Sequence, residues 1–75
     1  MDRIEMNPHV CAGKPVIRGT RIPVTVILDH LAEGMSREKV LEGFPMLCDE
    51  DISAAIAYAS RSIESTDVVL TPEEV

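Results

Sequence analysis

The chain has 75 residues, of which 45% are hydrophobic and only 3% aromatic, and its formal net charge is -6. This length allows one domain with a small aliphatic core, and folding at this size buries only about 60% of the surface of the unfolded chain, so we expect a homodimer. No apolar run reaches the roughly 20 residues that cross a bilayer, and no signal-peptide pattern is present, so we expect a cytoplasmic protein with no membrane segment.

Charge is distributed unevenly along the chain. Residues 1–40 hold six basic and five acidic side chains, whereas residues 41–75 hold one basic and eight acidic side chains. The first half is therefore suited to an anionic partner, and the second half would repel one.

The N-terminal segment predicts a β-hairpin. "RIEM" and "PVIRG" are short β-type runs, and the turn-rich "NPHVCAGK" joins them. Alternation from residue 14 to 18 predicts a basic face with Lys14, Val16 and Arg18, and an apolar face with Pro15 and Ile17. We expect Gly19 to adopt a positive φ in the turn that follows.

Two helices follow the hairpin. The segment "TRIPVTVILDHLAEGM" predicts a helix that Thr25 caps and Gly34 ends in the left-handed conformation. Ser36 then caps the shorter helix "REKVLEGF". Pro45 disfavours the α conformation at Phe44 and so ends that helix.

A third helix is predicted from about "CDEDISAAIAYASRSI", with three acids in its first turn, where carboxylates favour the positive end of the helix dipole. Its apolar residues recur at helical spacing: Ile52, Ala55, Ile56, Ala59 and Ile63. The fold class is therefore α+β and mainly α, an N-terminal β-hairpin followed by a three-helix core with a helix-turn-helix outline. We expect one domain over residues 1–63 and an acidic tail over residues 64–75, in which "DVVL" is a candidate strand or docking segment.

The strings "GKPVIRGTRIPV", "LAEGMSREKVLEGFPML" and "DISAAIAYA" resemble the prokaryotic family named domain of unknown function 433. The resemblance runs from about Ile4 to Tyr58. It implies a winged or homeodomain-like helix-turn-helix protein, and an antitoxin whose partner is a toxin related to PIN-domain ribonucleases. This chain has Cys48 where the family usually has a threonine that caps the last helix, so Asp49 or Asp51 is expected to take over the cap.

The third helix would read DNA in a helix-turn-helix regulator, but Asp49, Glu50 and Asp51 stand at the end that faces the bases. Affinity for DNA depends mainly on Lys and Arg that meet phosphates, so this helix counts against operator binding.

Clustered basic residues are the candidate site. For Lys14, Arg18 and Arg21 three roles stay open: clamping carboxylates within the hairpin or a dimer seam, contacting an acidic partner, or contacting nucleic acid. The full set of candidate partner-binding or nucleic-acid-binding residues is Lys14, Arg18, Thr20, Arg21, Arg37, Lys39 and Arg61.

We expect no metal site, no cofactor and no catalysis. His9, Cys11, His30 and Cys48 have spacings that fit no common zinc site, and no nucleophile motif is present. The run of acids from 49 to 51 sits on one helical turn, where adjacent side chains diverge by roughly 100°, so capping is expected in place of metal binding.

The sequence therefore predicts a non-catalytic antitoxin-like interaction protein that binds a PIN-related toxin, with operator DNA as a second ligand. The alternatives are a stand-alone DNA-binding regulator and a dimeric protein with no nucleic-acid role.

Overall fold

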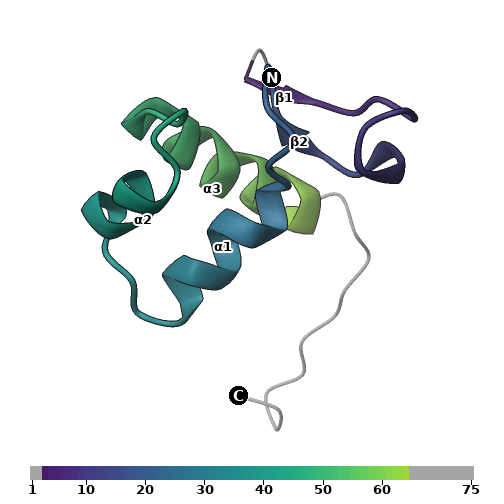
Figure 1. The fold of residues 1–75 in the computed structure, drawn as a ribbon. Helices are drawn as coiled ribbons and strands as arrows, with labels where there is room; N and C mark the ends of the chain where they lie inside the picture. Colours follow the sequence, from purple (N-terminus) through teal and green to yellow (C-terminus); the bar gives the residue numbers. More distant parts are fainter. Residues whose placement is uncertain (1–2, 65–75) are drawn as a thin grey trace, which may run out of the picture.

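The computed structural model describes residues 3–64 (Figure 1). Its elements in chain order are β1 (Ile4–Glu5), the short turn η1 (Cys11–Gly13), β2 (Val16–Ile17), α1 (Val24–Ala32), α2 (Arg37–Gly43) and α3 (Asp49–Glu64). The predicted α+β, mainly helical fold with an N-terminal hairpin is confirmed. Glu64 is the last residue of α3, and the rest of the predicted tail, "DVVL" included, lies outside the described residues.

The hairpin pairs β1 with β2 antiparallel, with Ile4 opposite Ile17 and Glu5 opposite Val16. The predicted basic and apolar faces are wrong, because Val16 and Ile17 are both buried. The strand is only two residues long. Lys14 closes the η1 turn before it, and Arg18 begins the next turn, so neither base shares a strand face with Val16.

The first helix begins at Val24, two residues earlier than it would with Thr25 as its cap. Pro23 is the N-cap and makes no side-chain cap, whereas Thr25 is exposed inside α1. The Val24 amide donates to the Pro15 carbonyl at 3.0 Å. The backbone just before β2 therefore satisfies one of the free amides at the start of α1, a role that a capping side chain usually has.

The other predicted helix boundaries are confirmed. Gly34 ends α1 with φ +94°, and the Met35 amide donates back to the His30 carbonyl at 3.1 Å. The Ser36 hydroxyl caps α2 by accepting from the Lys39 amide at 3.2 Å. Phe44, which precedes Pro45, leaves the helical region with φ -130° and ψ 76°.

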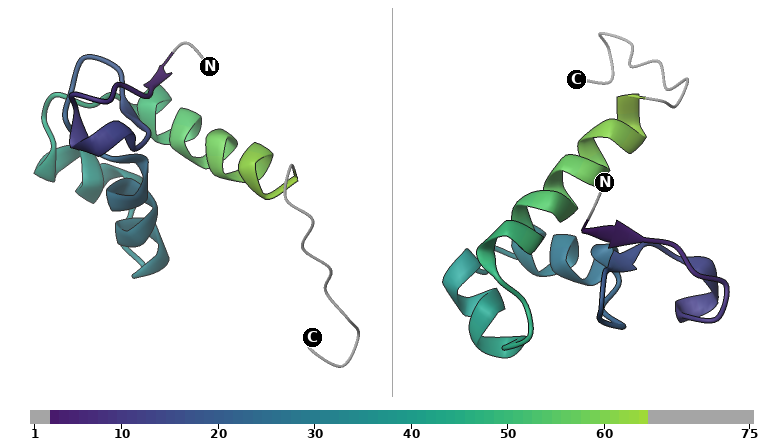
Figure 2. Two further views of the ribbon diagram at one scale, coloured as in Figure 1. Left: turned by 90° about the vertical axis from the view of Figure 1, so that its right-hand side faces the viewer. Right: turned by 90° about the horizontal axis from the view of Figure 1, so that it is seen from above.

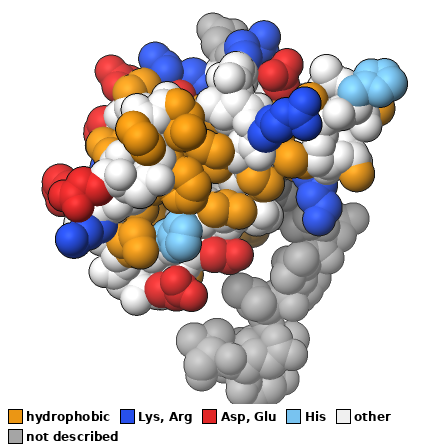
Figure 3. All heavy atoms as spheres, viewed as in Figure 1, with side chains coloured by type: hydrophobic (Ala, Val, Ile, Leu, Met, Phe, Trp, Pro, Cys, Tyr) orange, Lys and Arg blue, Asp and Glu red, His pale blue; other side chains and the backbone are white. Residues whose placement is uncertain are grey.

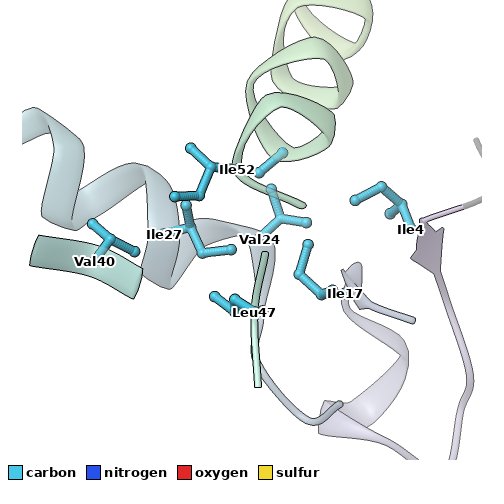
Figure 4. Close-up of a cluster of buried hydrophobic side chains, with 8 residues drawn as sticks. Ile4, Ile17, Val24, Ile27, Val40, Leu47 and Ile52 are labelled. Atoms are coloured by element: carbon cyan, nitrogen blue, oxygen red, sulfur yellow. The ribbon is translucent and has the colours of Figure 1, made fainter. Parts of the chain in front are cut away.

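Every main element contributes to one aliphatic core, in which the side chains point toward one another (Figure 4). The buried cluster comprises Ile4, Ile17, Val24, Ile27, Val40, Leu47, Ile52 and Ala55. Burying one such Ile, Leu or Val side chain contributes roughly 1.5–3 kcal/mol, so the hairpin is held on the helices by its own isoleucines.

The third helix extends beyond this core, and its C-terminal half projects from the rest of the fold (Figure 2). Ile52 and Ala55 are buried, but Ile56 is 43% and Ile63 is 68% exposed, so the predicted inward apolar face is wrong for these two residues. Within residues 3–64, no helix has the length and apolar content to cross a membrane.

Candidate functional site

Residues 18–21, which we name the hairpin tip, form the tight turn between β2 and the segment at Pro23 that bridges back to Val16. The neighbouring backbone holds this turn in place. The Thr20 amide donates to the Ile17 carbonyl at 3.0 Å, and Gly19 has φ +81°, as predicted. Below the tip, the Ile17 amide donates to the Ile22 carbonyl at 3.0 Å, and Val16 bridges Pro23. Arg18 and Arg21 therefore stand at the two ends of a defined turn.

The hydroxyl of Thr20 makes both of its described hydrogen bonds inside this turn. It donates to the Ile17 carbonyl at 2.8 Å and accepts from the Ile22 amide at 3.0 Å. Thr20 is a predicted binding residue, but the role that its contacts support is to hold the tip in shape.

A left-handed turn lies beside the tip. Cys11, Ala12 and Gly13 have φ values of 50°, 56° and 81°. Non-glycine residues in this region cost about 1 kcal/mol or more each, so the surrounding contacts must hold the turn. One such contact links the turn to the tip, since the Cys11 thiol donates to the Arg21 carbonyl at 3.4 Å.

We name Lys14, Arg18 and Arg21 the basic surface. All three side chains are exposed. Within residues 3–64, none of them forms an ion pair or a side-chain hydrogen bond. Blue side chains stand out on the hairpin side of the molecule in Figure 3. The described residues thus give no support to a clamp within the hairpin.

Arg37 has a different role, because it joins α2 to α3. Its Nε donates to Asp49 Oδ1 at 2.8 Å, and its Nη2 donates to the Asp49 carbonyl at 3.1 Å and to Ser53 Oγ at 2.7 Å. The hydrogen bond to Asp49 raises the pKa of Arg37, and the same contact lowers the pKa of the Asp49 carboxyl. Arg37 is therefore already engaged within the fold.

Lys39 and Arg61 are the remaining predicted binding residues, and both are exposed. Lys39 Nζ lies 3.5 Å from Glu42 Oε1 on the same helix. This ion pair is exposed to solvent and contributes little to the stability of the fold. Arg61 lies in the last turn of α3, a long way along the helix from its acidic start.

Arg3 is a structural residue that the sequence alone did not reveal. Its Nη1 donates to Asp51 Oδ1 at 3.0 Å and to Cys48 Sγ at 3.4 Å. Asp51 Oδ2 in turn accepts from the Cys48 amide at 3.0 Å, which is the carboxylate half of a capping box at the start of α3. Arg3 and Asp51 are far apart in the chain, so no local pattern marks this contact.

Opposing effects act on the Asp51 carboxyl. Burial acts to raise its pKa, but the hydrogen bonds from Cys48 and Arg3 favour the charged form and outweigh burial, so its pKa is lowered. The charged carboxylate ties the N-terminal strand to the start of α3.

The start of α3 is poorly suited to reading DNA. Asp49 and Glu50 are exposed there, and Arg37 is bound to Asp49 and Ser53 on the same side. Of the described cations, Lys14, Arg18 and Arg21 are the ones best placed to meet an anion, and they lie on the hairpin. Among residues 3–64, no three His, Cys, Asp or Glu side chains come together as a metal site.

Comparison with known proteins agrees with this architecture. An uncharacterized protein, y4eO, from Sinorhizobium fredii (strain NBRC 101917 / NGR234) is 41% identical over 59 residues, which are 79% of this chain and 27% of that protein. The 2.00 Å crystal structure of a DUF433 member from Anabaena variabilis ATCC 29413 is 36% identical and superposes with a TM-score of 0.79 over 85% of this chain and 63% of that one. The chain thus spans less than two thirds of the length of both relatives.

The model of the family described as "Protein of unknown function (DUF433)" matches residues 4–59, which include both strands, α1, α2 and most of α3. The matched region contains the basic surface and the hairpin tip. The chain belongs to the DUF433 family.

Proposed function

We propose that the protein is a non-catalytic, antitoxin-like interaction protein whose basic surface binds an acidic partner, a toxin related to PIN-domain ribonucleases. One observation supports this most: Lys14, Arg18 and Arg21 are exposed, and none of them pairs with a carboxylate among residues 3–64. In a chain of net charge -6, unpaired bases are groups that an external acidic partner would complement. The proposal places both proteins in the cytoplasm.

The active sites of PIN-type nucleases are formed by acidic residues that hold a metal. An arginine guanidinium is well suited to bind the carboxylates of such a site. Its planar donors bind a carboxylate at two points, more selectively than a lysine ammonium does. Because Thr20 and the Val16–Pro23 bridge already fix the tip, Arg18 and Arg21 lose little backbone freedom on binding.

The test is to co-express the chain with the protein from its neighbouring reading frame, which we expect to be PIN-like, and to measure the complex by size-exclusion chromatography with light scattering. We expect a complex with the wild type. The triple variant Lys14→Ala, Arg18→Ala, Arg21→Ala should bind at least about 30-fold more weakly, as expected when central arginines are removed from an interface. The matched control Lys39→Ala removes an exposed base from α2 and should bind as the wild type does.

Operator DNA is the second candidate ligand, because the same three exposed bases can meet phosphates. In this case the hairpin, rather than α3, contacts the duplex. Binding to promoter DNA would weaken steeply with salt, and the triple variant would lower the slope of log K against log salt by about 0.9 for each phosphate that it no longer neutralises. A chain that binds its promoter but not the PIN-like protein would be a stand-alone regulator and would overturn the toxin-binding proposal.

A further inference from the structure

The C-terminal segment, residues 65–75, has a charge opposite to that of the basic surface. Its sequence "STDVVLTPEEV" contains the three carboxylates of Asp67, Glu73 and Glu74 and no basic residue. This segment lies outside the described residues. Among residues 3–64, the bases of the basic surface pair with no carboxylate. One chain therefore holds both an unpaired basic surface and an acidic segment that is complementary to it.

The contacts of α3 show from which side of the fold this segment continues. The Tyr58 hydroxyl on α3 donates to Met6 Sδ, just after β1, at 3.9 Å. Glu64, where α3 ends, lies six residues beyond Tyr58, which is about 9 Å along the helix axis. The contact of Arg37 on α2, in contrast, is with Asp49 at the opposite end of α3. The chain beyond α3 therefore continues from the half of the helix that contacts the hairpin.

The length of the segment is sufficient to reach the basic surface. Val16 pairs with Glu5 in an antiparallel hairpin, so Lys14 and Met6 lie toward the same end of the paired strands. Glu73 is nine residues beyond the end of α3, and nine extended residues span up to about 30 Å. This span exceeds the roughly 9 Å back along α3 together with the roughly 5 Å between paired strands. The two adjacent glutamates can therefore reach the ammonium group of Lys14.

We propose that the basic surface is a docking site for the C-terminal segment of the same chain, with Glu73 and Glu74 paired to Lys14 and to the guanidinium groups of the hairpin tip. This inference rests on the proposed function, because the acidic partner binds the same surface and must displace the segment.

The expected effect is a moderate competition. Exposed ion pairs are weak, so a partner with a larger interface can displace the segment. If the segment covers the surface in about 70–90% of molecules, the apparent affinity for an external anion falls about threefold to tenfold. The segment thus selects against weakly bound polyanions and in favour of a partner that makes further contacts.

Zero-length cross-linking of the full chain at low salt tests the contact directly. A carbodiimide joins a lysine amine to a neighbouring carboxylate as an amide and takes up the water that is lost, becoming a urea. Lys14 and Lys39 are the two lysines of the chain. We expect mass spectrometry to find Lys14 joined to Glu73 or Glu74. Lys39, which already lies 3.5 Å from Glu42, is the internal control and should not be joined to them.

Mixing unlabelled and isotope-labelled chains before cross-linking identifies the chain that supplies the segment. If the segment docks on its own chain, each linked peptide pair carries a single isotope composition. If it docks on a second copy, pairs of mixed composition form.

Binding of a heparin oligosaccharide tests the effect on an external anion. Glu73→Gln, Glu74→Gln should bind heparin about threefold to tenfold more tightly than the matched control Asp29→Asn, Glu38→Gln. The control removes two exposed carboxylates from α1 and α2, so both double variants change the net charge equally. The difference should disappear when the triple substitution of the basic surface is added to both.

Three results would each overturn the proposal: cross-links to the segment that are no more abundant on Lys14 than on Lys39, linked pairs of mixed isotope composition, or equal heparin affinities of the two double variants. The PIN-like partner is absent from all of these measurements. A failure of toxin binding would leave their results unchanged, and a failure here would leave the toxin-binding proposal standing.

Discussion

The basic residues of the described chain fall into two groups according to what they contact. Arg3 and Arg37 are bound to the carboxylates of Asp51 and Asp49 at the start of α3, where they hold the hairpin and α2 to that helix. The residues of the basic surface have no such contact among residues 3–64. The first group therefore stabilises the fold, and the second is available to a partner.

Thr20 is a predicted binding residue whose described hydrogen bonds both lie within the hairpin tip. Thr20→Val keeps the shape of the side chain but removes both hydrogen bonds of the tip, so we expect a loss of about 1–2 kcal/mol in the free energy of unfolding. The control Thr25→Val changes an exposed threonine on α1 and should alter stability by less than about 0.5 kcal/mol. Urea denaturation of the three proteins measures both values, and equal stabilities for Thr20→Val and the wild type would contradict this role.

Asp51 makes stability depend on pH in a predictable direction. Its pKa in the folded protein lies below the ordinary value of 3.8, so the unfolded chain binds the proton more readily. The stabilisation is complete above the unfolded pKa and is lost as the pH falls through the folded value. Between about pH 5 and pH 2, the free energy of unfolding should fall more steeply for the wild type than for Asp51→Asn.

Urea denaturation at a series of pH values tests this prediction. Asp49 also has a lowered pKa and is present in both proteins, so it contributes equally to both slopes. Parallel pH profiles for the wild type and Asp51→Asn would show that Asp51 is not the group responsible.

Helix ends differ in how far the sequence alone determines them. Ser36, Gly34 and Pro45 act on residues within three positions in the chain, and each boundary they predict is confirmed. The predicted start of α1 is wrong because the Pro15 carbonyl, from a segment earlier in the chain, accepts from the Val24 amide. A local signal can be read from the sequence, whereas a contact between segments requires the fold.

This difference predicts opposite effects for two alanine substitutions. Ser36→Ala removes a cap and should destabilise the protein by about 1 kcal/mol. Thr25→Ala removes no cap and improves helix propensity within α1, so it should be neutral or stabilise by a few tenths of a kcal/mol. Thermal and urea denaturation give both values, and a loss of about 1 kcal/mol for Thr25→Ala would restore Thr25 as the cap.

The site is also predictable only in part. The hairpin and the grouping of Lys14, Arg18 and Arg21 follow from residues close together in the chain. The Arg3–Asp51 contact does not, because the residues between them form the whole of the fold that brings the two together. The exposure of Ile56 is likewise hidden, since helical spacing places it beside Ile52 but does not show where the core ends.

At the scale of the whole molecule, orange apolar side chains gather at the centre of the face seen in Figure 3, and blue basic side chains lie on the hairpin side of it. The hairpin packs against the helices through the buried Ile4 and Ile17, so the fold holds the backbone of the basic surface in a fixed position.

The most direct test of the central claim is the dissociation constant of the PIN-like partner for the wild type and for Arg18→Glu, Arg21→Glu, measured by calorimetry at low and high ionic strength. We expect charge reversal to weaken binding by about 100-fold or more at low salt, and added salt to reduce the difference because it screens exposed charges. Equal affinities for the two proteins at low salt would contradict the claim that this surface binds the partner.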